Sequence, residues 1–338
     1  MVMRFISDKY GYKALFDENT GKTIRLDGAD NCNNWKKSGP ELLDISITNY
    51  CERNCSFCYR NSSKVGKHMS TSLYRDIINE AKELKVFQVA LGGGNPNQHP
   101  DFVDFLKIAR ENNIIPSYTT NGDGMTSEIL DATKVYCGAL AVSWYEPYNN
   151  AITLIEECFN RDIKVNIHFV LDADNISKAR DLLNLEIIDK VNAIIFLNYK
   201  PVGLEKRTVL KSTKELSTFL YDVINFSRCQ VGFDSCMISH LTMIKNSLVL
   251  ESVDYCEASR YSAFISEQGM VYPCSFMCGQ GLNGESILST SLLEIWQNSL
   301  VFNQIRKTLF FKSNKCMNCE HYQFCHGGCP CFSISCIE

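Results

Sequence analysis

Apolar and polar positions alternate along much of the chain with two periods, one typical of strands and one typical of helices. A strand-like run at 42–48 is followed by a helical pattern at 71–84, which has one apolar face and the cap candidates Ser70 and Thr71. Five further predicted strands, each followed by a turn or a helical stretch, lie at 87–91, 114–120, 139–143, 164–170 and 193–198. This alternation predicts an α/β fold with parallel strands, a TIM-like partial barrel of six strand–helix units.

Two other regions flank the predicted barrel. Residues 1–41 predict a short β-hairpin with strands at 5–16 and 23–26, followed by a polar connection. Helical patterns at 213–226 and 292–309 bracket the change to a cysteine-rich region. The predicted domains are the hairpin with its connection at 1–41, the barrel at 42–235 and a small cysteine-rich domain at 236–338.

Composition narrows the classes of function. The 338 residues suffice for one large domain and a smaller one, and the net charge of -4 comes without a basic stripe that would favour nucleic acid. The N-terminus lacks the apolar core of a signal peptide, and no stretch reaches the ~20 apolar residues of a membrane span. We therefore expect a cytoplasmic protein without membrane contact, in which the abundance of cysteines, 17 in all, indicates metal ligands rather than disulfides, although Cys32, Cys137, Cys158 and Cys229 have no partner at cluster spacing.

Three cysteines form a CxxxCxxC loop directly after the first strand of the predicted barrel: Cys51, Cys55 and Cys58. Three thiolates in one short loop can hold three irons of a cubane cluster and leave the fourth iron free for a ligand. The alternative is a zinc site, but structural zinc needs a fourth protein ligand, and no Cys or His stands at that spacing nearby. With Phe57 before the third cysteine, the loop resembles the radical S-adenosylmethionine (radical SAM) superfamily.

This resemblance implies an enzyme. In the family, the free iron of a [4Fe-4S] cluster binds the amino and carboxylate groups of SAM. An electron from the cluster then breaks the sulfur–carbon bond of SAM, and the resulting 5'-deoxyadenosyl radical abstracts hydrogen from a substrate. The resemblance makes Cys51, Cys55 and Cys58 the catalytic cluster ligands, and it implies a flavodoxin- or ferredoxin-type electron donor.

A glycine run at 92–96 ends the second strand of the predicted barrel, where glycines let the backbone approach a polar ligand closely. It resembles the family's GGEP-type motif, which contacts the SAM amino group, although Asn95 replaces the usual Glu. By the same resemblance, the ends of the later strands would contact the carboxylate and ribose of SAM. Within the strand at 164–170, apolar and polar residues alternate, so its polar residues face away from the helices. For each later position taken singly, ordinary structural polarity remains the alternative. The candidate SAM contacts are Tyr59, Gly92, Gly93, Gly94, Asn95, Pro96, Thr120, Asn121, Ser143, Asn166 and His168.

The C-terminal cysteines form a long pattern that resembles the SPASM extension of radical SAM enzymes. Cys256 precedes Gly269 by 12 intervening residues, four residues separate Gly269 from Cys274, and a C-x2-C-x5-C-x3-C run follows. The resemblance implies two auxiliary [4Fe-4S] clusters, and a zinc ribbon is the alternative. The distal cluster would use Cys316, Cys319, Cys325 and Cys336, with Cys331 as the alternative to Cys336. The proximal cluster would use Cys256, Cys274, Cys329 and Cys278, with Cys236 or an open iron as alternatives to Cys278.

These motifs define a reaction type more than a substrate. SPASM enzymes mostly cross-link ribosomal peptides through thioether or carbon–carbon bonds, or oxidise sulfatases to formylglycine. Ser275 stands where sulfatase maturases carry an Asp that serves as a general base. Because serine is a poor base, this difference favours peptide cross-linking. The hypothesis is a radical SAM oxidoreductase that matures a ribosomal peptide, docked on the N-terminal hairpin or through a separate recognition protein. The alternatives are a sulfatase maturase, a radical dehydrogenase of small molecules and a non-enzymatic iron–sulfur or zinc scaffold.

Overall fold

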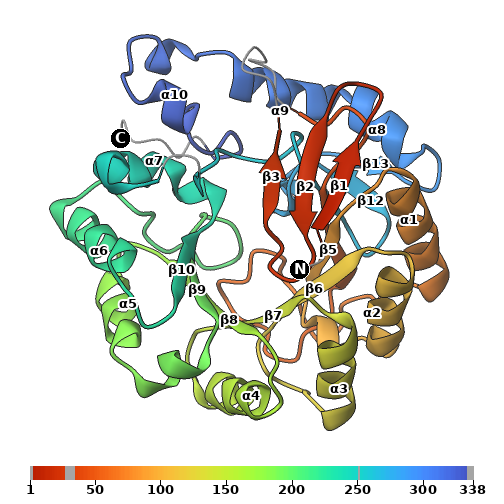
Figure 1. The fold of residues 1–338 in the computed structure, drawn as a ribbon, viewed down its shortest axis with the longest axis horizontal. Coiled ribbons are helices and arrows are strands. Elements are labelled where there is room, and N and C mark those ends of the chain that lie inside the picture. Colours follow the sequence, from red (N-terminus) through yellow and green to blue (C-terminus); the bar gives the residue numbers. More distant parts are fainter. Residues whose placement is uncertain (1–2, 27–34, 250–251, 333–338) are drawn as a thin grey trace. The chain divides into compact units, whose positions relative to one another are not determined.

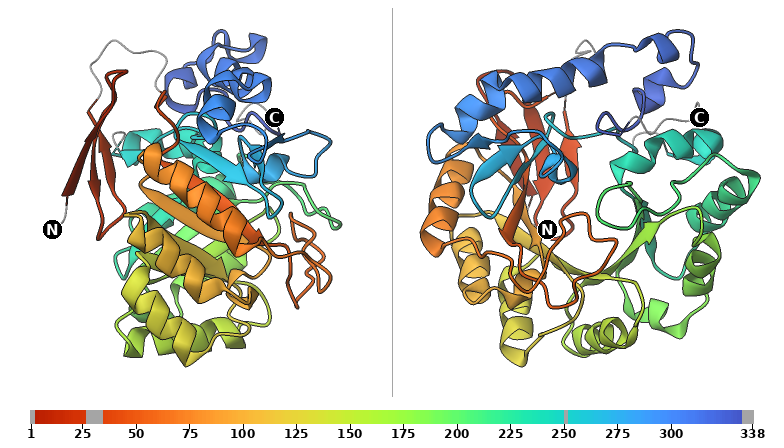
Figure 2. Two further views of the ribbon diagram at one scale, coloured as in Figure 1. Left: turned by 90° about the vertical axis from the view of Figure 1, so that its right-hand side faces the viewer. Right: turned by 180° about the vertical axis from the view of Figure 1, so that it is seen from behind.

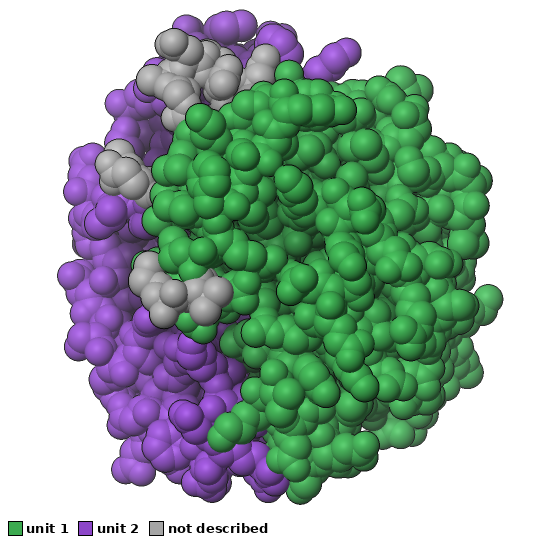
Figure 3. Space-filling model, turned by 45° about the vertical axis from the view of Figure 1, so that its right-hand side comes forward, with its two compact units in different colours: residues 1–54, 62–140, 258–306 green, residues 55–61, 141–257, 307–338 purple. Residues whose placement is uncertain are grey.

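The structure is a computed structural model that describes residues 3–26, 35–249 and 252–332. The chain divides into two compact units, and each is described by itself (Figure 3). The first consists of Met1–Asn54, Ser62–Leu140 and Ala258–Arg306, and the second of Cys55–Asn61, Ala141–Glu257 and Lys307–Glu338. The predicted domain boundaries after residues 41 and 235 stay a prediction. Within the described residues, no helix is long and apolar enough to cross a membrane.

The first unit holds a small N-terminal sheet and a larger sheet (Figure 1). Its strands are β1 (Met3–Ser7), β2 (Lys13–Asp17), β3 (Thr23–Arg25), β4 (Leu42–Thr48), β5 (Gln88–Gly93), β6 (Ile115–Thr120), β11 (Ser262–Ile265), β12 (Met270–Tyr272) and β13 (Glu285–Ser286). Its helices are α1 (Thr71–Glu83), α2 (Phe102–Glu111), α3 (Ser127–Tyr136) and α8 (Leu292–Asn298). The larger sheet runs in the order β6-β5-β4-β11-β12-β13 within this unit.

The predicted N-terminal hairpin is a three-stranded antiparallel sheet in the order β1-β2-β3, drawn in red in Figure 2. The predicted strand at 5–16 is interrupted by a turn, where the Asp8 carboxylate accepts hydrogen bonds from the backbone N–H groups of Tyr10 and Tyr12. Gly11 completes this turn with a φ of 88°, a conformation that favours glycine. Because of this turn, the single strand predicted at 5–16 is two strands, β1 and β2.

Parallel strands β4, β5 and β6 position the first site, with α1 and α2 as the crossover helices between them and α3 after β6 (Figures 1 and 2). Helix α1 begins as predicted, because the Ser70 side chain accepts a hydrogen bond from the N–H of Leu73. It packs on α2 through stacked rings of Tyr74 and Phe105, whose centroids are 4.2 Å apart. The parallel arrangement brings the carboxyl ends of the three strands to one edge of the sheet.

The second unit continues the same alternation of strands and helices. Its elements are α4 (Asn149–Asn160), β8 (Val165–Leu171), α5 (Ile176–Leu183), β9 (Ala193–Asn198), α6 (Lys214–Ile224), β10 (Gln230–Phe233), α7 (Ile238–Leu241) and α10 (Tyr322–Cys325). Strands β8, β9 and β10 are parallel, and Phe196 of β9 packs edge-on against Phe219 of α6 at 5.3 Å. Strand β7 (Ala139–Ser143) and helix α9 (Leu300–Phe310) cross the boundaries between the units. The six predicted strand–helix units are all present, which confirms the α/β fold class.

The helix predicted at 292–309 is two helices, α8 and α9. Ser299 between them has a ψ of 130°, which is not helical, and its hydroxyl accepts a hydrogen bond from the N–H of Phe302. The Ser299 side chain thus caps the start of α9, and the helical pattern predicted at 292–309 is divided at this residue.

Candidate functional site

The glycine turn at the end of β5 lies directly against the beginning of the cysteine loop in the first unit. A Cβ atom on Gly93 would stand 2.1 Å from the Thr48 carbonyl oxygen, and one on Gly94 would stand 2.0 Å from the Tyr50 carbonyl oxygen. Gly93 also has a φ of 105°. Only glycine satisfies both the space and the backbone conformation, so the run after β5 is required for this close approach.

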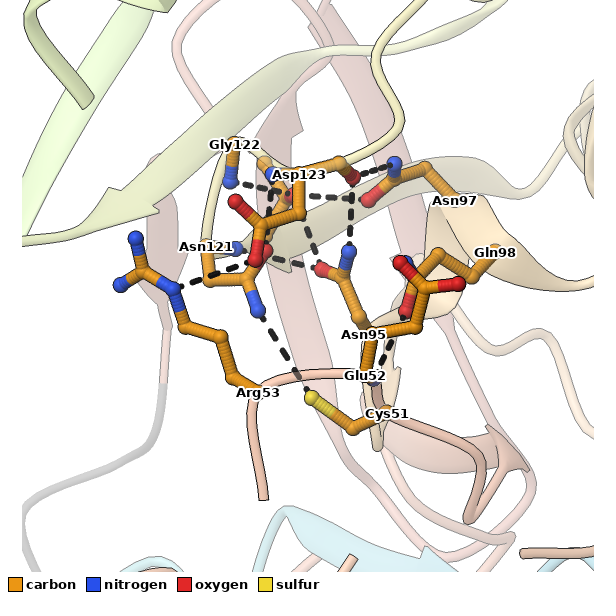
Figure 4. Close-up of polar contacts among 10 residues, drawn as sticks. Cys51, Glu52, Arg53, Asn95, Asn97, Gln98, Asn121, Gly122 and Asp123 are labelled. Atoms are coloured by element: carbon orange, nitrogen blue, oxygen red, sulfur yellow. Dashed lines mark hydrogen bonds and ion pairs between the residues drawn. The ribbon is translucent and has the colours of Figure 1, made fainter. Parts of the chain in front are cut away.

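Asn95 is buried at 1% exposure and links the glycine turn to the end of β6 (Figure 4). Its side-chain oxygen accepts hydrogen bonds from the Thr120 hydroxyl at 2.9 Å and from the Asn121 N–H at 3.2 Å. Its amide nitrogen donates to the Asp123 carbonyl oxygen at 2.9 Å. Because this amide both accepts and donates, a Glu at this position could not replace all of its bonds.

Asn97 forms a second bridge between the same two turns. Its side-chain nitrogen donates to the Asp123 carbonyl oxygen at 2.7 Å, and its oxygen lies 2.6 Å from the Thr120 hydroxyl. Arg53 of the cysteine loop pairs with the Asp123 carboxylate at 3.1 Å (Figure 4). We call Asn95, Asn97, Thr120, Asn121 and Asp123 the asparagine network; sequence reasoning missed Asn97 and Asp123, although both stand beside predicted positions.

Of the three loop cysteines, Cys51 belongs to the first unit, and it forms a hydrogen bond with the asparagine network. The Asn121 side-chain nitrogen donates to the Cys51 sulfur at 3.7 Å (Figure 4). The Cys51 N–H donates to the Ser63 carbonyl oxygen at 3.1 Å, which fixes the backbone. Hydrogen bonds to a cysteine sulfur stabilise the thiolate form, which is the form that ligates iron and whose hydrogen bonds tune cluster potentials.

Cys55 and Cys58 belong to the second unit, where a separate segment braces them. The Cys58 N–H donates to the Cys55 carbonyl oxygen at 3.1 Å, so the two residues form a tight turn. The Glu205 N–H donates to the Ser56 carbonyl oxygen at 3.0 Å, and the Ser56 hydroxyl donates to the Glu205 carboxylate. Phe57 lies between the two cysteines in the sequence, and the Arg207 guanidinium lies 4.0 Å from the centroid of its ring. Sequence reasoning missed this brace, because no motif marks it.

The remaining candidate SAM contacts lie in the second unit. Tyr59 lies in the cysteine loop and Ser143 ends β7, and both are half-buried. Asn166 lies at the beginning of β8 rather than at its end, and it accepts a hydrogen bond from the Asn192 side chain at 2.9 Å. His168 lies in the middle of β8, and burial lowers its pKa to about 4, so its imidazole is neutral at pH 7. The alternating burial of β8 confirms that both residues share one face of the strand.

The cysteines of the C-x2-C-x5-C run surround a sharp turn in the second unit. Cys316 and Cys325 are buried, and both lie near Tyr322, whose pKa is raised by burial and by these two cysteines. His326, Gly327 and Gly328 all have positive φ, so the chain reverses after α10. A Cβ atom on Gly327 would lie 3.6 Å from the Cys316 sulfur. The turn therefore brings the beginning of the run close to its end.

Cys329 lies in contact with two further cysteines, and we call Cys236, Cys329 and Cys331 the cysteine triplet. Hydrogen bonds from the Cys236 and Cys331 side chains lower the pKa of the buried Cys329 thiol to about 3. The same contact with Cys329, together with burial, raises the pKa of Cys236. The Cys236 and Cys331 side chains thus both lie within hydrogen-bonding contact of the Cys329 sulfur, and such contacts favour the thiolate form that ligates iron.

The other predicted cluster ligands are distributed over both units. Cys256 is buried in the second unit, whereas Cys274 and Cys278 are half-buried in the first. Cys336 lies outside the described residues. Among the described His, Cys, Asp and Glu side chains, no group of three is arranged to hold a single metal ion. The donor set is nevertheless the one that iron–sulfur clusters use, since the described cysteines are free thiols rather than disulfides.

Two family profiles match the chain. The Radical SAM superfamily profile matches residues 45–144, which include the cysteine loop, the glycine turn and the asparagine network. The SPASM profile, described as an iron-sulfur cluster-binding domain, matches residues 256–320.

Several known proteins are similar to this chain over most of its length. Mycofactocin maturase MftC from Mycobacterium ulcerans is 27% identical over 320 residues, covering 86% of this chain and 83% of the relative. PqqA peptide cyclase from Bradyrhizobium diazoefficiens is 24% identical, covering 86% of this chain and 82% of the relative. Streptococcus suis SuiB, solved with its precursor peptide SuiA, shares the fold with a TM-score of 0.71 at 20% identity, covering 86% of this chain and 72% of SuiB. The chain therefore carries a radical SAM domain, whose cofactors are SAM and an iron–sulfur cluster, followed by a SPASM domain that binds auxiliary iron–sulfur clusters.

Proposed function

We propose that this protein is an enzyme that oxidatively modifies a ribosomally made peptide, forming a thioether or carbon–carbon cross-link. The observation that carries the proposal is the asparagine network, which holds the glycine turn, the end of β6 and Cys51 in one hydrogen-bonded arrangement. Two relatives matched over most of their length are a maturase and a peptide cyclase by name, and SuiB binds a precursor peptide. These relatives favour a peptide over a small molecule.

In this proposal, Cys51, Cys55 and Cys58 hold three irons of the radical SAM cluster. When bound, the cluster and SAM supply a 5'-deoxyadenosyl radical that removes a hydrogen atom from the peptide. The turn at 92–96 and the end of β6 hold the polar groups of SAM, and Asn121 orients Cys51 through its bond to the sulfur. The segment around Glu205 and Arg207 keeps Cys55 and Cys58 in place.

Two auxiliary clusters in the SPASM domain would accept the electron that the peptide loses on oxidation. We propose Cys316, Cys319 and Cys325 as ligands of one cluster, and their gathering around the turn at 326–328 supports a common site. Cys256, Cys274 and Cys329 would serve the other. A flavodoxin- or ferredoxin-type protein would reduce the radical SAM cluster.

The peptide would dock as an added strand on the N-terminal sheet. Within the described residues, β1 and β3 form the two edges of this sheet, and Phe5 and Ile24 are exposed on them. An exposed edge offers backbone hydrogen bonds, and exposed apolar side chains offer contacts for alternate peptide residues. A separate recognition protein would add contacts if this small sheet binds too weakly alone.

The test is anaerobic co-expression of the enzyme with the short peptide encoded beside its gene, followed by mass spectrometry of the peptide. We expect the loss of a hydrogen pair, and fragmentation should locate the new bond. The control is the same co-expression with Cys51, Cys55 and Cys58 changed to Ala, which should leave the mass unchanged. An unmodified peptide in both cultures, with SAM cleaved in the presence of a sugar or an amino acid alone, would contradict the proposal and favour a small-molecule dehydrogenase.

A further inference from the structure

Cys236 stands far from the other C-terminal cysteines in sequence, yet its side chain lies in hydrogen-bonding contact with that of Cys329. The contact arises because the chain leaves β10, passes Cys236 in a single 3-10 turn (Ser235–Met237) and enters α7. Helix α7 packs against α10, which ends at Cys325, four residues before Cys329. The fold therefore delivers Cys236 to the C-terminal cysteine run.

The backbone at Cys236 is held rigidly. The Asn198 side chain, at the end of β9, donates to the Cys236 carbonyl oxygen at 2.9 Å. The Asp234 carboxylate accepts from the Asn198 N–H at 3.1 Å and pairs with the buried Lys200 ammonium at 3.3 Å. The backbone that carries the Cys236 side chain is thus fixed from the ends of β9 and β10, which favours a preorganised ligand.

Buried polar atoms without a hydrogen-bond partner occur in α7, the helix that follows Cys236, and in α10. Ser239 and His240 are buried at 0% and 1% exposure, and the Ser239 hydroxyl and both His240 ring nitrogens form no hydrogen bond within the described residues. The Tyr322 hydroxyl of α10 is also unbonded there. Because buried polar atoms are nearly always paired, the unbonded atoms of α7 and α10, two helices that pack against each other, indicate a place that a polar group completes. The inorganic sulfides of an iron–sulfur cluster are acceptors of this kind.

We propose that Cys236, and not Cys278, is the fourth protein ligand of the auxiliary cluster that Cys329 also ligates. This inference rests on the proposed function only in requiring that the SPASM domain be loaded with its clusters. Cys331, the other neighbour of Cys329, is then available to the distal cluster as the alternative to Cys336. The assignment closes the coordination of the proximal cluster, so no iron of that cluster is left open to the peptide.

The test uses the enzyme with Cys51, Cys55 and Cys58 changed to Ala, so that all remaining iron belongs to the auxiliary clusters. Cys236→Ser and Cys278→Ser are compared in this background, with Cys229→Ser as a matched control, since the contacts of the Cys229 sulfur are with the backbone of Gln230 and Ile194. Iron and sulfide are counted, and the electron paramagnetic resonance spectrum is recorded after mild oxidation. A cubane with one non-cysteine ligand loses that iron readily and gives a three-iron signal.

We expect the three-iron signal from Cys236→Ser and not from Cys278→Ser or Cys229→Ser. The reverse pattern, or no signal from Cys236→Ser, would overturn the assignment. A background protein without auxiliary iron would overturn it too, together with the proposed cluster content. Loss of peptide modification in an enzyme with intact clusters would instead count against the proposed peptide substrate and leave this assignment standing.

A second measurement covers the case in which Cys236→Ser fails to fold. The loaded wild-type enzyme is alkylated anaerobically before and after removal of its iron by a chelator, and the modified cysteines are mapped by mass spectrometry. Cys158 is fully buried in α4 and should resist alkylation in both samples, which controls for protection by burial alone. Cys236 should become reactive only after iron removal. Equal reactivity of Cys236 in the two samples would contradict the proposal.

Discussion

The asparagine network of the first unit and Cys236 of the cysteine triplet in the second both follow the ends of parallel strands, but the buried polar groups of the two regions have different partners. Asn95 uses its oxygen and its nitrogen in bonds to other protein groups, and Asn97 does the same. In the second region, Ser239 and His240 of α7 and Tyr322 of α10 leave polar atoms unbonded within the described residues. The first region is thus completed by the protein itself, whereas the proposed cluster would complete the second, so the two regions should respond differently to loss of metal.

The largest effect should come from the cysteine loop. Changing Cys51, Cys55 and Cys58 to Ala removes the three proposed iron ligands, and we expect SAM cleavage to be abolished. Deoxyadenosine formed under strong reductant measures this, with Cys229→Ser as the control that keeps the loop. Persistent cleavage in the triple variant would refute the assignment of the loop.

Iron removal should separate the two regions. We expect a chelator to accelerate hydrogen exchange strongly at 235–247 and 316–332, because the polar groups there lose the partner that completes them. Exchange in β4, β5 and β6 should change little, since the asparagine network is bonded within the protein. Mass spectrometry of the exchanged peptides measures both regions in one sample, and equal acceleration in the two would break the comparison.

Asn95→Asp tests the asparagine network directly. An aspartate keeps the acceptor for Thr120 but cannot donate to the Asp123 carbonyl oxygen, and it places a charge at a buried position. We expect the free energy of unfolding to fall by about 1–3 kcal/mol, measured by anaerobic urea unfolding. Asn79→Asp on the exposed face of α1 is the matched control and should change stability little.

The smallest effect concerns Lys36, another buried group of the first unit that is satisfied by protein atoms. Its ammonium donates to the Leu84 and Pro40 carbonyl oxygens, while burial lowers its pKa from 10.5 to about 8. Between these two pH values the unfolded chain binds more protons than the folded chain, so the free energy of unfolding rises with pH.

We expect a gain of about 1 kcal/mol from pH 8 to pH 9 relative to Lys36→Met, which lacks the titrating group. Urea unfolding of both proteins at the two pH values measures this difference. A gain of the same size in Lys36→Met would assign the pH dependence to other groups.

Much of the fold could be predicted because the parallel strands carry either a continuous apolar run, as in β9, or an alternation of apolar and polar residues, as in β8, between helical patterns. The strand predicted at 114–120 is β6, Ile115–Thr120, and the strand at 193–198 is β9, Ala193–Asn198. The predicted elements are wrong at two places, where a polar side chain ends a strand or a helix but the periodic pattern of apolar residues continues past it. Asp8 turns the N-terminal strand, and Ser299 ends one helix and begins the next.

The candidate sites could be predicted in part. The cysteine loop and the glycine turn are local motifs, and the structure brings Asn95, Thr120 and Asn121 together at one sheet edge. The contact between Cys236 and Cys329 is different, because it depends on the path of β9, β10 and α7 rather than on spacing. For the same reason, the brace of Glu205 and Arg207 on the cysteine loop had no signal in the sequence.

The close approach of the glycine turn to the cysteine loop constrains how this protein can evolve. The backbone at Gly93 and Gly94 touches residues 48–50, and Gly66 on the other side would meet the Asn49 carbonyl oxygen at 1.9 Å if it carried a Cβ atom. An insertion or deletion in any one of these three segments would force the other two to move. The segments are therefore expected to keep their lengths together through evolution, while the surface loops around them vary freely.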